Sequence, residues 1–313
     1  KDVWVKVFNA RPETTSSDTE SASYDDFIRH LITESQEDGG WVVKSDNVWR
    51  IEPLTHIRLV LANQGLNPKD TTSALGNAIT KPWKLVSKPF EPEYPGDREW
   101  NRTAAQLRYT PAAEPGPHPT WDKILKHCGQ GLDDAIKRHA WCKSVGITTG
   151  GDYLKVWIAC MIRDPYQPLP YLFFYSQQQN TGKSIFHEGT SLLLKRGSER
   201  AETALLSQAG FNGELEGQVL CIVEEVDLRQ NKQAYNRIKD WVTARDMVIH
   251  YKGDTVYSLP NTSHWVQVAN NHNYCPVFPG DTRITMCHVQ PLDPMDLIPK
   301  KRLIPLLEKE APN

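Results

Sequence analysis

The stretch SQQQNTGKS at residues 176–184 contains the residue types that proteins use to bind nucleotide phosphates. In a phosphate-binding loop of the pattern GxxxxGK[ST], backbone N–H groups surround the phosphates, the lysine reaches the terminal phosphates, and the hydroxyl group binds magnesium. Gly182, Lys183 and Ser184 occupy the last three positions, whereas Gln177 stands where the first glycine is expected. A side chain there strains the turn only if the backbone needs a positive φ. The nucleotide-binding residues predicted in this loop are Gln179, Asn180, Thr181, Gly182, Lys183, Ser184 and Ile185.

Two adjacent acids, Glu224 and Glu225, follow a later apolar run, VLCIV. A magnesium–nucleotide site needs one carboxylate near the metal and a second one that orients or deprotonates the attacking water. We assign the metal to Ser184 and Glu224, and the water to Glu225. The alternative is that the two acids simply meet solvent at the end of a strand.

A third apolar run, HWVQVA, ends in the pair Asn270-Asn271. An amide beside a γ-phosphate can hold the attacking water and respond to the presence of the phosphate. An Asn-Asn pair is equally ordinary in a turn. The pair therefore indicates a nucleotide site only in combination with the loop and the acids.

Each of these groups follows a run that predicts a buried strand: YLFFY at 171–175, QVLCIVE at 218–224 and SHWVQVA at 263–269. Helical apolar patterns precede them at 121–146 and 152–164, and a helix-compatible segment follows the loop. Apolar strands that alternate with helices predict an α/β fold with a parallel sheet covered on both faces. Ligands bind at the carboxyl ends of such strands.

The N-terminal part has a different composition. Residues 25–35 and 54–63 show helical spacing, and two β-prone runs in 41–51 flank Ser45-Asp46-Asn47, which predicts a hairpin. Residues 82–120 are rich in proline, which indicates a connection rather than a core. We expect a smaller, mostly helical accessory domain with a β-hairpin at 1–115, followed by the larger domain at 116–313.

The composition excludes several classes of protein. The chain has 36 Lys and Arg against 38 Asp and Glu, so it creates no global basic field, although a local basic channel remains compatible with these numbers. Six cysteines without a CxxC pair argue against a disulfide framework and against a zinc site. No apolar run approaches the length of a membrane span, so we expect a cytoplasmic protein without a membrane partner. The chain begins at Lys1 rather than methionine, and we expect it to be a piece of a longer protein.

Taken in order, the loop, the acids and the asparagines resemble the motifs of superfamily 3 helicases, which are AAA+ ATPases, and especially the helicase half of phage, plasmid and poxvirus primase-helicases. SQQQNTGKS is similar to the first motif, usually GPxGTGKS or GPxNTGKS, and departs from it at Gln177 and Gln178. VEE matches the second motif, and ANNHN resembles the third, which places the sensing asparagine at Asn271. The resemblance extends from about Trp121 to Val289.

Two further segments carry the resemblance. Residues 238–265 resemble a hairpin with a basic tip, which implies a turn at Lys252-Gly253-Asp254 and DNA contacts from Lys252 and His250. GDTRITMCHV resembles the segment that presents an arginine to the nucleotide of the neighbouring subunit, and Arg283 is the match. Without the resemblance, Arg283 is an ordinary salt-bridge residue, Lys252 a solvated lysine and His250 a sheet histidine.

The resemblance implies an AAA+ P-loop NTPase core in a hexameric ring, which hydrolyses ATP with Mg²⁺ between subunits and moves single-stranded DNA. The catalytic residues implied are Lys183, Glu224, Glu225, Asn271 and Arg283. It also implies a phage or mobile-element protein of a bacterial cell, with an upstream primase or primase-polymerase domain. Two other functions stay open: an AAA+ ATPase that remodels or loads a replication protein without unwinding, and a non-catalytic DNA-binding ring, which only Gln177 and Gln178 support.

Overall fold

The computed structural model describes residues 24–32, 40–46, 48–252, 256–278 and 280–313. They form two compact units. The first unit ends at Val86 and also includes Tyr94–Trp100, whereas the second includes Ser87–Glu93 and Asn101–Asn313. The chain therefore passes between the units at 86–87, at 93–94 and at 100–101.

The first unit is built on a five-stranded sheet with the order β3-β2-β1-β4-β5. β2 and β3 form the antiparallel hairpin predicted at 41–51, and β1 pairs antiparallel with β2 and parallel with β4. Helices α3 and α4 contribute Ile57, Leu61 and Leu75 to a core with Ile28 and Val43 of the sheet. The elements are β1 (Ile28–Ile32), β2 (Trp41–Ser45), β3 (Val48–Ile51), α3 (Leu54–Asn63), α4 (Pro68–Thr80), β4 (Trp83–Leu85) and β5 (Glu99–Trp100).

Three sequence predictions for this unit are wrong. Residues 28–32 form β1 instead of a helix. Ile28 and Leu31 are buried on opposite faces of the sheet, so the apolar residues of this strand do not alternate and their spacing resembles that of a helix. The unit is a helix-and-sheet structure rather than mostly helical. The proline-rich region is more than a connection, since it supplies β4 and β5, and Trp100 is fully buried.

The second unit contains a five-stranded sheet with the order β14-β7-β13-β10-β9, in which every neighbouring pair is parallel. β7 reads YLFFY and β13 reads HWVQVA, and nearly all of their residues are buried, as the two-sided burial of a parallel strand requires. The predicted parallel sheet is confirmed. Its strands are β7 (Tyr171–Tyr175), β9 (Ser198–Arg200), β10 (Leu220–Glu224), β13 (His264–Ala269) and β14 (Ile284–His288).

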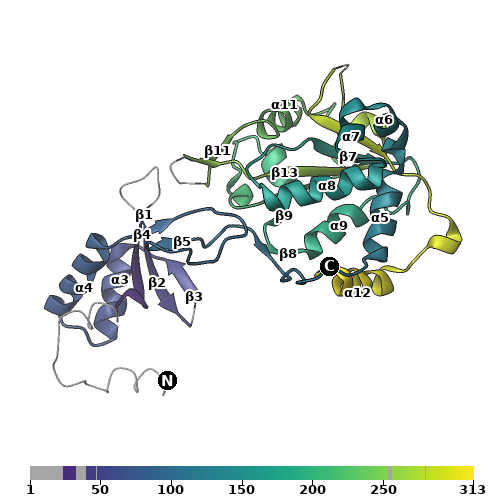
Figure 1. Ribbon diagram of the computed structural model, residues 1–313. Coiled ribbons are helices and arrows are strands. Elements are labelled where there is room, and N and C mark those ends of the chain that lie inside the picture. The colour runs from purple at the N-terminus through teal and green to yellow at the C-terminus, as the bar shows by residue number, and fades with distance from the viewer. Residues whose placement is uncertain (1–23, 33–39, 47, 253–255, 279) are drawn as a thin grey trace. The chain divides into compact units, whose positions relative to one another are not determined.

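Helices cover both faces of this sheet (Figure 1). One face carries Leu172, Phe174 and Val266 and packs against a layer that includes α5 (Pro119–Gly129), α8 (Gly150–Arg163), α9 (Ile185–Leu192) and α12 (Lys300–Glu310). The other face carries Tyr171, Phe173 and Trp265 and packs against α10 (Glu202–Leu206) and α11 (Lys232–Trp241). The smaller elements are β6 (Gln106–Leu107), η1 (Gln130–Leu132), α6 (Asp133–Arg138), α7 (Ala140–Ser144), β8 (Leu194–Arg196), η2 (Gly213–Leu215), β11 (Asp246–Ile249), β12 (Tyr257–Pro260), η3 (His272–Tyr274) and η4 (Pro294–Asp296).

Glycines allow α5 and α8 to approach very closely. A Cβ atom added to Gly150 would lie 1.8 Å from the carbonyl oxygen of Gly129, and one added to Gly129 would lie 2.2 Å from the carbonyl carbon of Gly150. Thr149 caps α8 and forms a capping box with Asp152, which fixes where the helix begins. The backbone of α8 therefore rests directly on the end of α5.

The C-terminal helix α12 is hydrogen-bonded to the start of α5. Glu310 accepts hydrogen bonds from the backbone N–H of Thr120 at 2.8 Å and from its hydroxyl at 2.6 Å, and the indole of Trp121 donates to the carbonyl of Leu307 at 3.0 Å. No helix within the described ranges is both long and apolar enough to cross a membrane.

Candidate functional site

The loop at residues 176–184 joins the end of β7 to the start of α9, as a phosphate-binding loop should. Asn180 and Gly182 adopt positive φ angles of 57° and 80°. Glycine does so freely, and asparagine tolerates this conformation better than most residues. Gln177 is not among the described residues that have a positive φ. The missing first glycine therefore causes no backbone strain.

Two observations at this loop fit a bound anion. The hydroxyl of Thr181 is buried and has no hydrogen-bond partner among the described residues, so it is available to form a hydrogen bond with a ligand. The amino group of Lys183 donates to the backbone carbonyl of Gln178 at 3.3 Å, which folds the side chain back over its own loop. Burial lowers the pKa of the Lys183 ammonium group, and the nearby Glu225 carboxylate partly opposes this effect.

Asn270 connects Lys183 to Glu225. Its Oδ1 accepts a hydrogen bond from Lys183 Nζ at 3.0 Å, and its Nδ2 donates to Glu225 Oε1 at 2.8 Å. The sequence prediction named the next residue, Asn271. The side chain of Asn271 instead accepts from the backbone N–H of Asn273 at 2.9 Å and caps η3, because β13 ends at Ala269 and only the first of the two amides faces the loop.

Glu225 and Glu224 have different surroundings although they are adjacent. Glu225 has a φ of 54° and reaches the Lys183–Asn270 pair, as described above. Glu224 lies 3.0 Å from Arg200 Nη2 and 3.2 Å from His187 Nε2, the latter without hydrogen-bond alignment. Burial lowers the pKa of His187, which keeps the ring neutral at pH 7 despite the opposing effect of Glu224.

The described residues contain no group of three or more His, Cys, Asp or Glu side chains that could hold a metal ion. Nucleotide-bound Mg²⁺ usually takes only one or two protein ligands and completes its shell with phosphates and waters. Ser184, at the start of α9, and Glu224, at the end of β10, therefore remain the predicted metal-binding pair.

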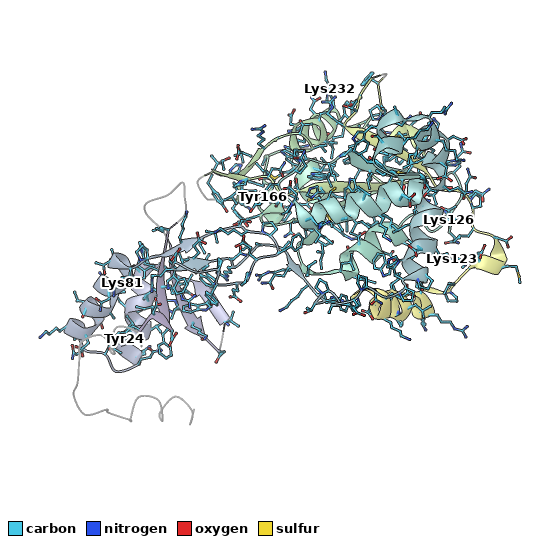
Figure 2. The ribbon with its side chains drawn as sticks, viewed as in Figure 1. Tyr24, Lys81, Lys123, Lys126, Tyr166 and Lys232 are labelled. Atoms are coloured by element: carbon cyan, nitrogen blue, oxygen red, sulfur yellow. The ribbon has the colours of Figure 1, made fainter. Side chains whose placement is uncertain are left out.

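Sequence reasoning missed His127. This residue lies on α5, and its Nε2 is 2.8 Å from the backbone carbonyl of Thr181, so α5 contacts the loop at residues 176–184 directly. The same helix carries Lys123 and Lys126 (Figure 2), and Lys123 Nζ donates to Asp296 at 2.7 Å. No local pattern signals this contact, because His127 and Thr181 are far apart in the sequence.

The predicted hairpin with a basic tip is present as the antiparallel pair β11–β12. Lys252 is exposed directly before the tip, while residues 253 and 254 of the predicted turn lie outside the described residues. His250 donates its backbone N–H to Asn212 Oδ1 at 2.8 Å, and its ring meets that of Phe211 with centroids 4.8 Å apart. Phe211 was not identified from the sequence.

A single carboxylate holds the tip end of this hairpin. Glu216 Oε2 accepts hydrogen bonds from the hydroxyl groups of Tyr251 at 2.8 Å and Tyr257 at 2.7 Å, one on each side of the tip. Gly213 lies against Tyr251, where an added Cβ would come within 2.3 Å of the ring. The hairpin is thus fastened to the segment that precedes β10.

Arg283 lies just before β14 and binds Asp281 with two parallel hydrogen bonds, Nε–Oδ1 at 2.9 Å and Nη2–Oδ2 at 2.8 Å. This bidentate pairing lowers the pKa of Asp281 and raises that of Arg283. The structure thus brings together Lys183, Glu225 and Asn270 in one site. Arg283 and His250 make other contacts, and Lys252 is exposed on the β11–β12 hairpin.

The relaxed backbone at Gln177 leads to a prediction. Because the N–H groups of the loop do not depend on a glycine there, Gln177→Gly is expected to change nucleotide affinity by less than about tenfold. Titration with a fluorescent ATP analogue would measure this, with Gln178→Gly as the matched control for added chain flexibility. A larger change confined to Gln177→Gly would show that its side chain contacts the ligand.

Comparisons with known proteins show one family profile that matches part of the sequence and several solved structures with a similar fold. A protein-family profile described as "Family of unknown function (DUF5906)" matches residues 174–283, a range that runs from the end of β7 to Arg283. No curated protein matches the sequence.

Solved structures that resemble the chain include "The apo structure of NrS-1 C terminal region (305-718)", with a TM-score of 0.63 and 17% identity, covering 93% of this chain and 66% of that one. "The A form apo structure of NrS-1 C terminal region-CTR" has a TM-score of 0.63 at 16% identity, with the same coverage of 93% and 66%. A further A form structure of this region has a TM-score of 0.58 at 15% identity and covers 88% of this chain and 62% of that one. The chain thus spans slightly less than two thirds of these structures and shares their fold.

Proposed function

We propose that this chain is the ATP-hydrolysing motor of a replicative DNA helicase of the superfamily 3 type, working as a hexameric ring on single-stranded DNA. The observation that carries the proposal is the contact series Lys183–Asn270–Glu225. These side chains come from the loop after β7 and from the carboxyl ends of β13 and β10, which is the edge of a parallel sheet where ligands bind.

In this proposal the loop N–H groups and Lys183 hold the phosphates of ATP, and Ser184 and Glu224 hold Mg²⁺. Glu225 accepts a proton from the water that attacks the γ-phosphorus, and Asn270 orients that water. A P–O bond forms to the water as the bond to the β-phosphate oxygen breaks, and ADP and phosphate leave. Lys183 stabilises the negative charge on the phosphates, as in other P-loop enzymes.

Arg283 is proposed to act on the nucleotide of a neighbouring subunit, where such an arginine raises the rate by about 10³-fold or more. Its two hydrogen bonds to Asp281 hold the guanidinium in a fixed plane. Preorganisation of this kind reduces the entropy lost when the arginine meets a phosphate.

Single-stranded DNA is proposed to bind at the β11–β12 hairpin. Lys252 supplies a positive charge for the phosphate backbone, and the rings of His250 and Phe211 offer a surface on which bases can stack. Copies of the hairpin around a ring would form a salt-dependent track.

The decisive test is ATP hydrolysis by this chain with and without single-stranded DNA, beside Lys183→Ala. DNA-stimulated hydrolysis that Lys183→Ala abolishes is the expected result, followed by strand separation of a forked duplex. Stimulated hydrolysis without strand separation would favour an ATPase that remodels or loads another replication protein. Absence of hydrolysis at protein concentrations where light scattering detects rings would contradict the proposal.

A further inference from the structure

Gln267 is a polar residue at the centre of β13, the most deeply buried strand of the second unit, and it is fully buried itself. Both ends of its amide are hydrogen-bonded. Oε1 accepts from the hydroxyl of Tyr171 at 2.9 Å, and Nε2 donates to the backbone carbonyl of Val226 at 2.6 Å. The Val226 carbonyl can only accept, so this arrangement allows a single orientation of the amide.

Tyr171 fixes the other end of the series. Its side chain is fully buried on β7, and burial raises the pKa of the hydroxyl well above its usual range, so the group stays protonated and able to donate. The series Tyr171–Gln267–Val226 therefore runs from β7 through β13 to the segment that follows β10.

That segment contains the unusual backbone turn at Glu225. A glutamate with a φ of 54° is disfavoured, and such a conformation persists only when its surroundings impose it. The backbone N–H of Glu225 donates to the carbonyl of Val268 at 2.9 Å, which holds the peptide before the turn. The bond from Gln267 to the Val226 carbonyl holds the peptide plane that follows Val226.

We propose that Gln267, oriented by Tyr171, is a positioning residue that imposes the turn at Glu225 and so aims this carboxylate at Asn270 and the attacking water. The inference rests on the proposed function, since it concerns the acid assigned to that water. The side chains of Gln267 and Tyr171 hydrogen-bond to one another and to the Val226 carbonyl, so their effect on catalysis is transmitted through the backbone of Val226 and Glu225.

The test uses Gln267→Met, which keeps an unbranched side chain of similar length and removes the donor. Without the Gln267 amide, the Val226 carbonyl loses its hydrogen-bond donor and the Tyr171 hydroxyl loses its acceptor, and the turn at Glu225 relaxes. We expect kcat for ATP hydrolysis to fall by about 100-fold, the effect of misplacing a catalytic group by about 1 Å. Affinity for a fluorescent ATP analogue should stay unchanged, because the phosphate-binding loop is intact. Tyr171→Phe should lower kcat in the same direction but less.

A matched control is Trp265→Phe, which removes buried volume from the same face of β13 two residues earlier. It should lower the resistance to urea without lowering kcat. A kcat for Gln267→Met that is equal to that of the wild type, or that falls only as far as that of Trp265→Phe, would overturn the inference.

Hydrogen exchange tests whether Gln267 holds the turn at Glu225, and it does not require ATP hydrolysis. The Glu225 amide should exchange faster in Gln267→Met than in the wild type and remain protected in Trp265→Phe, and unchanged exchange would overturn the inference. If the wild-type chain hydrolyses no ATP, the proposed function fails, while the exchange measurement still shows whether Gln267 holds the turn.

Discussion

Replacing Glu225 with glutamine is expected to lower kcat for ATP hydrolysis by about 10²–10⁴-fold, the usual contribution of a general base. The amide of glutamine can still accept the hydrogen bond that Asn270 Nδ2 now donates at 2.8 Å, so the arrangement around Lys183 should survive. It cannot take a proton from the water. Steady-state hydrolysis at saturating ATP measures the loss, and nucleotide titration should show affinity close to that of the wild type.

Glu224→Gln is the matched control for this experiment, because it changes the adjacent acid in the same way. Since Glu224 is assigned to the metal, this variant should need a higher Mg²⁺ concentration for half-maximal activity. A Glu225→Gln variant that no longer binds nucleotide would mean that the two acids have the opposite roles.

The largest expected loss of stability comes from Gly150→Ala. The added methyl group would lie 1.8 Å from the carbonyl oxygen of Gly129, and neither backbone can move without separating α5 from α8. Overpacking of this kind costs about 3 kcal/mol. Urea unfolding followed by circular dichroism should therefore show a lower midpoint for the second unit.

Gly189→Ala provides the comparison within the same unit. An added Cβ at Gly189, inside α9, would meet the ring of Trp121 at 3.4 Å, an ordinary contact, and alanine favours helices over glycine by about 1 kcal/mol. Its unfolding midpoint should stay the same or rise. If Gly150→Ala unfolds like the wild type, the two helices are less tightly packed than described.

The sequence predicts the three central strands of the second unit well, because each of their features is local. β7, β10 and β13 are short apolar runs, and polar side chains follow each run directly. A buried parallel strand and the polar residues at its carboxyl end are therefore both visible in one window of sequence.

What the sequence does not reveal depends on neighbours that are distant in the chain. β1 has the apolar spacing of a helix and becomes a strand only because β2 and β4 lie on either side of it. The choice between Asn270 and Asn271 depends on where β13 ends, and boundaries are the least certain part of a sequence prediction. His127 and Gln267 contact carbonyl groups of other elements, which no pattern of residue types can show.

The three passages of the chain between its two units also decide how the protein can be cut. A fragment that begins at Asn101 would lose Ser87–Glu93, whose residue Phe90 donates its backbone N–H to the Ala105 carbonyl at 2.8 Å. A fragment that begins at Ser87 would keep Tyr94–Trp100 and so carry β5 away from the first sheet. No single proteolytic cleavage between 86 and 101 separates the units cleanly, because at least one of the two fragments would retain a segment that belongs to the other unit.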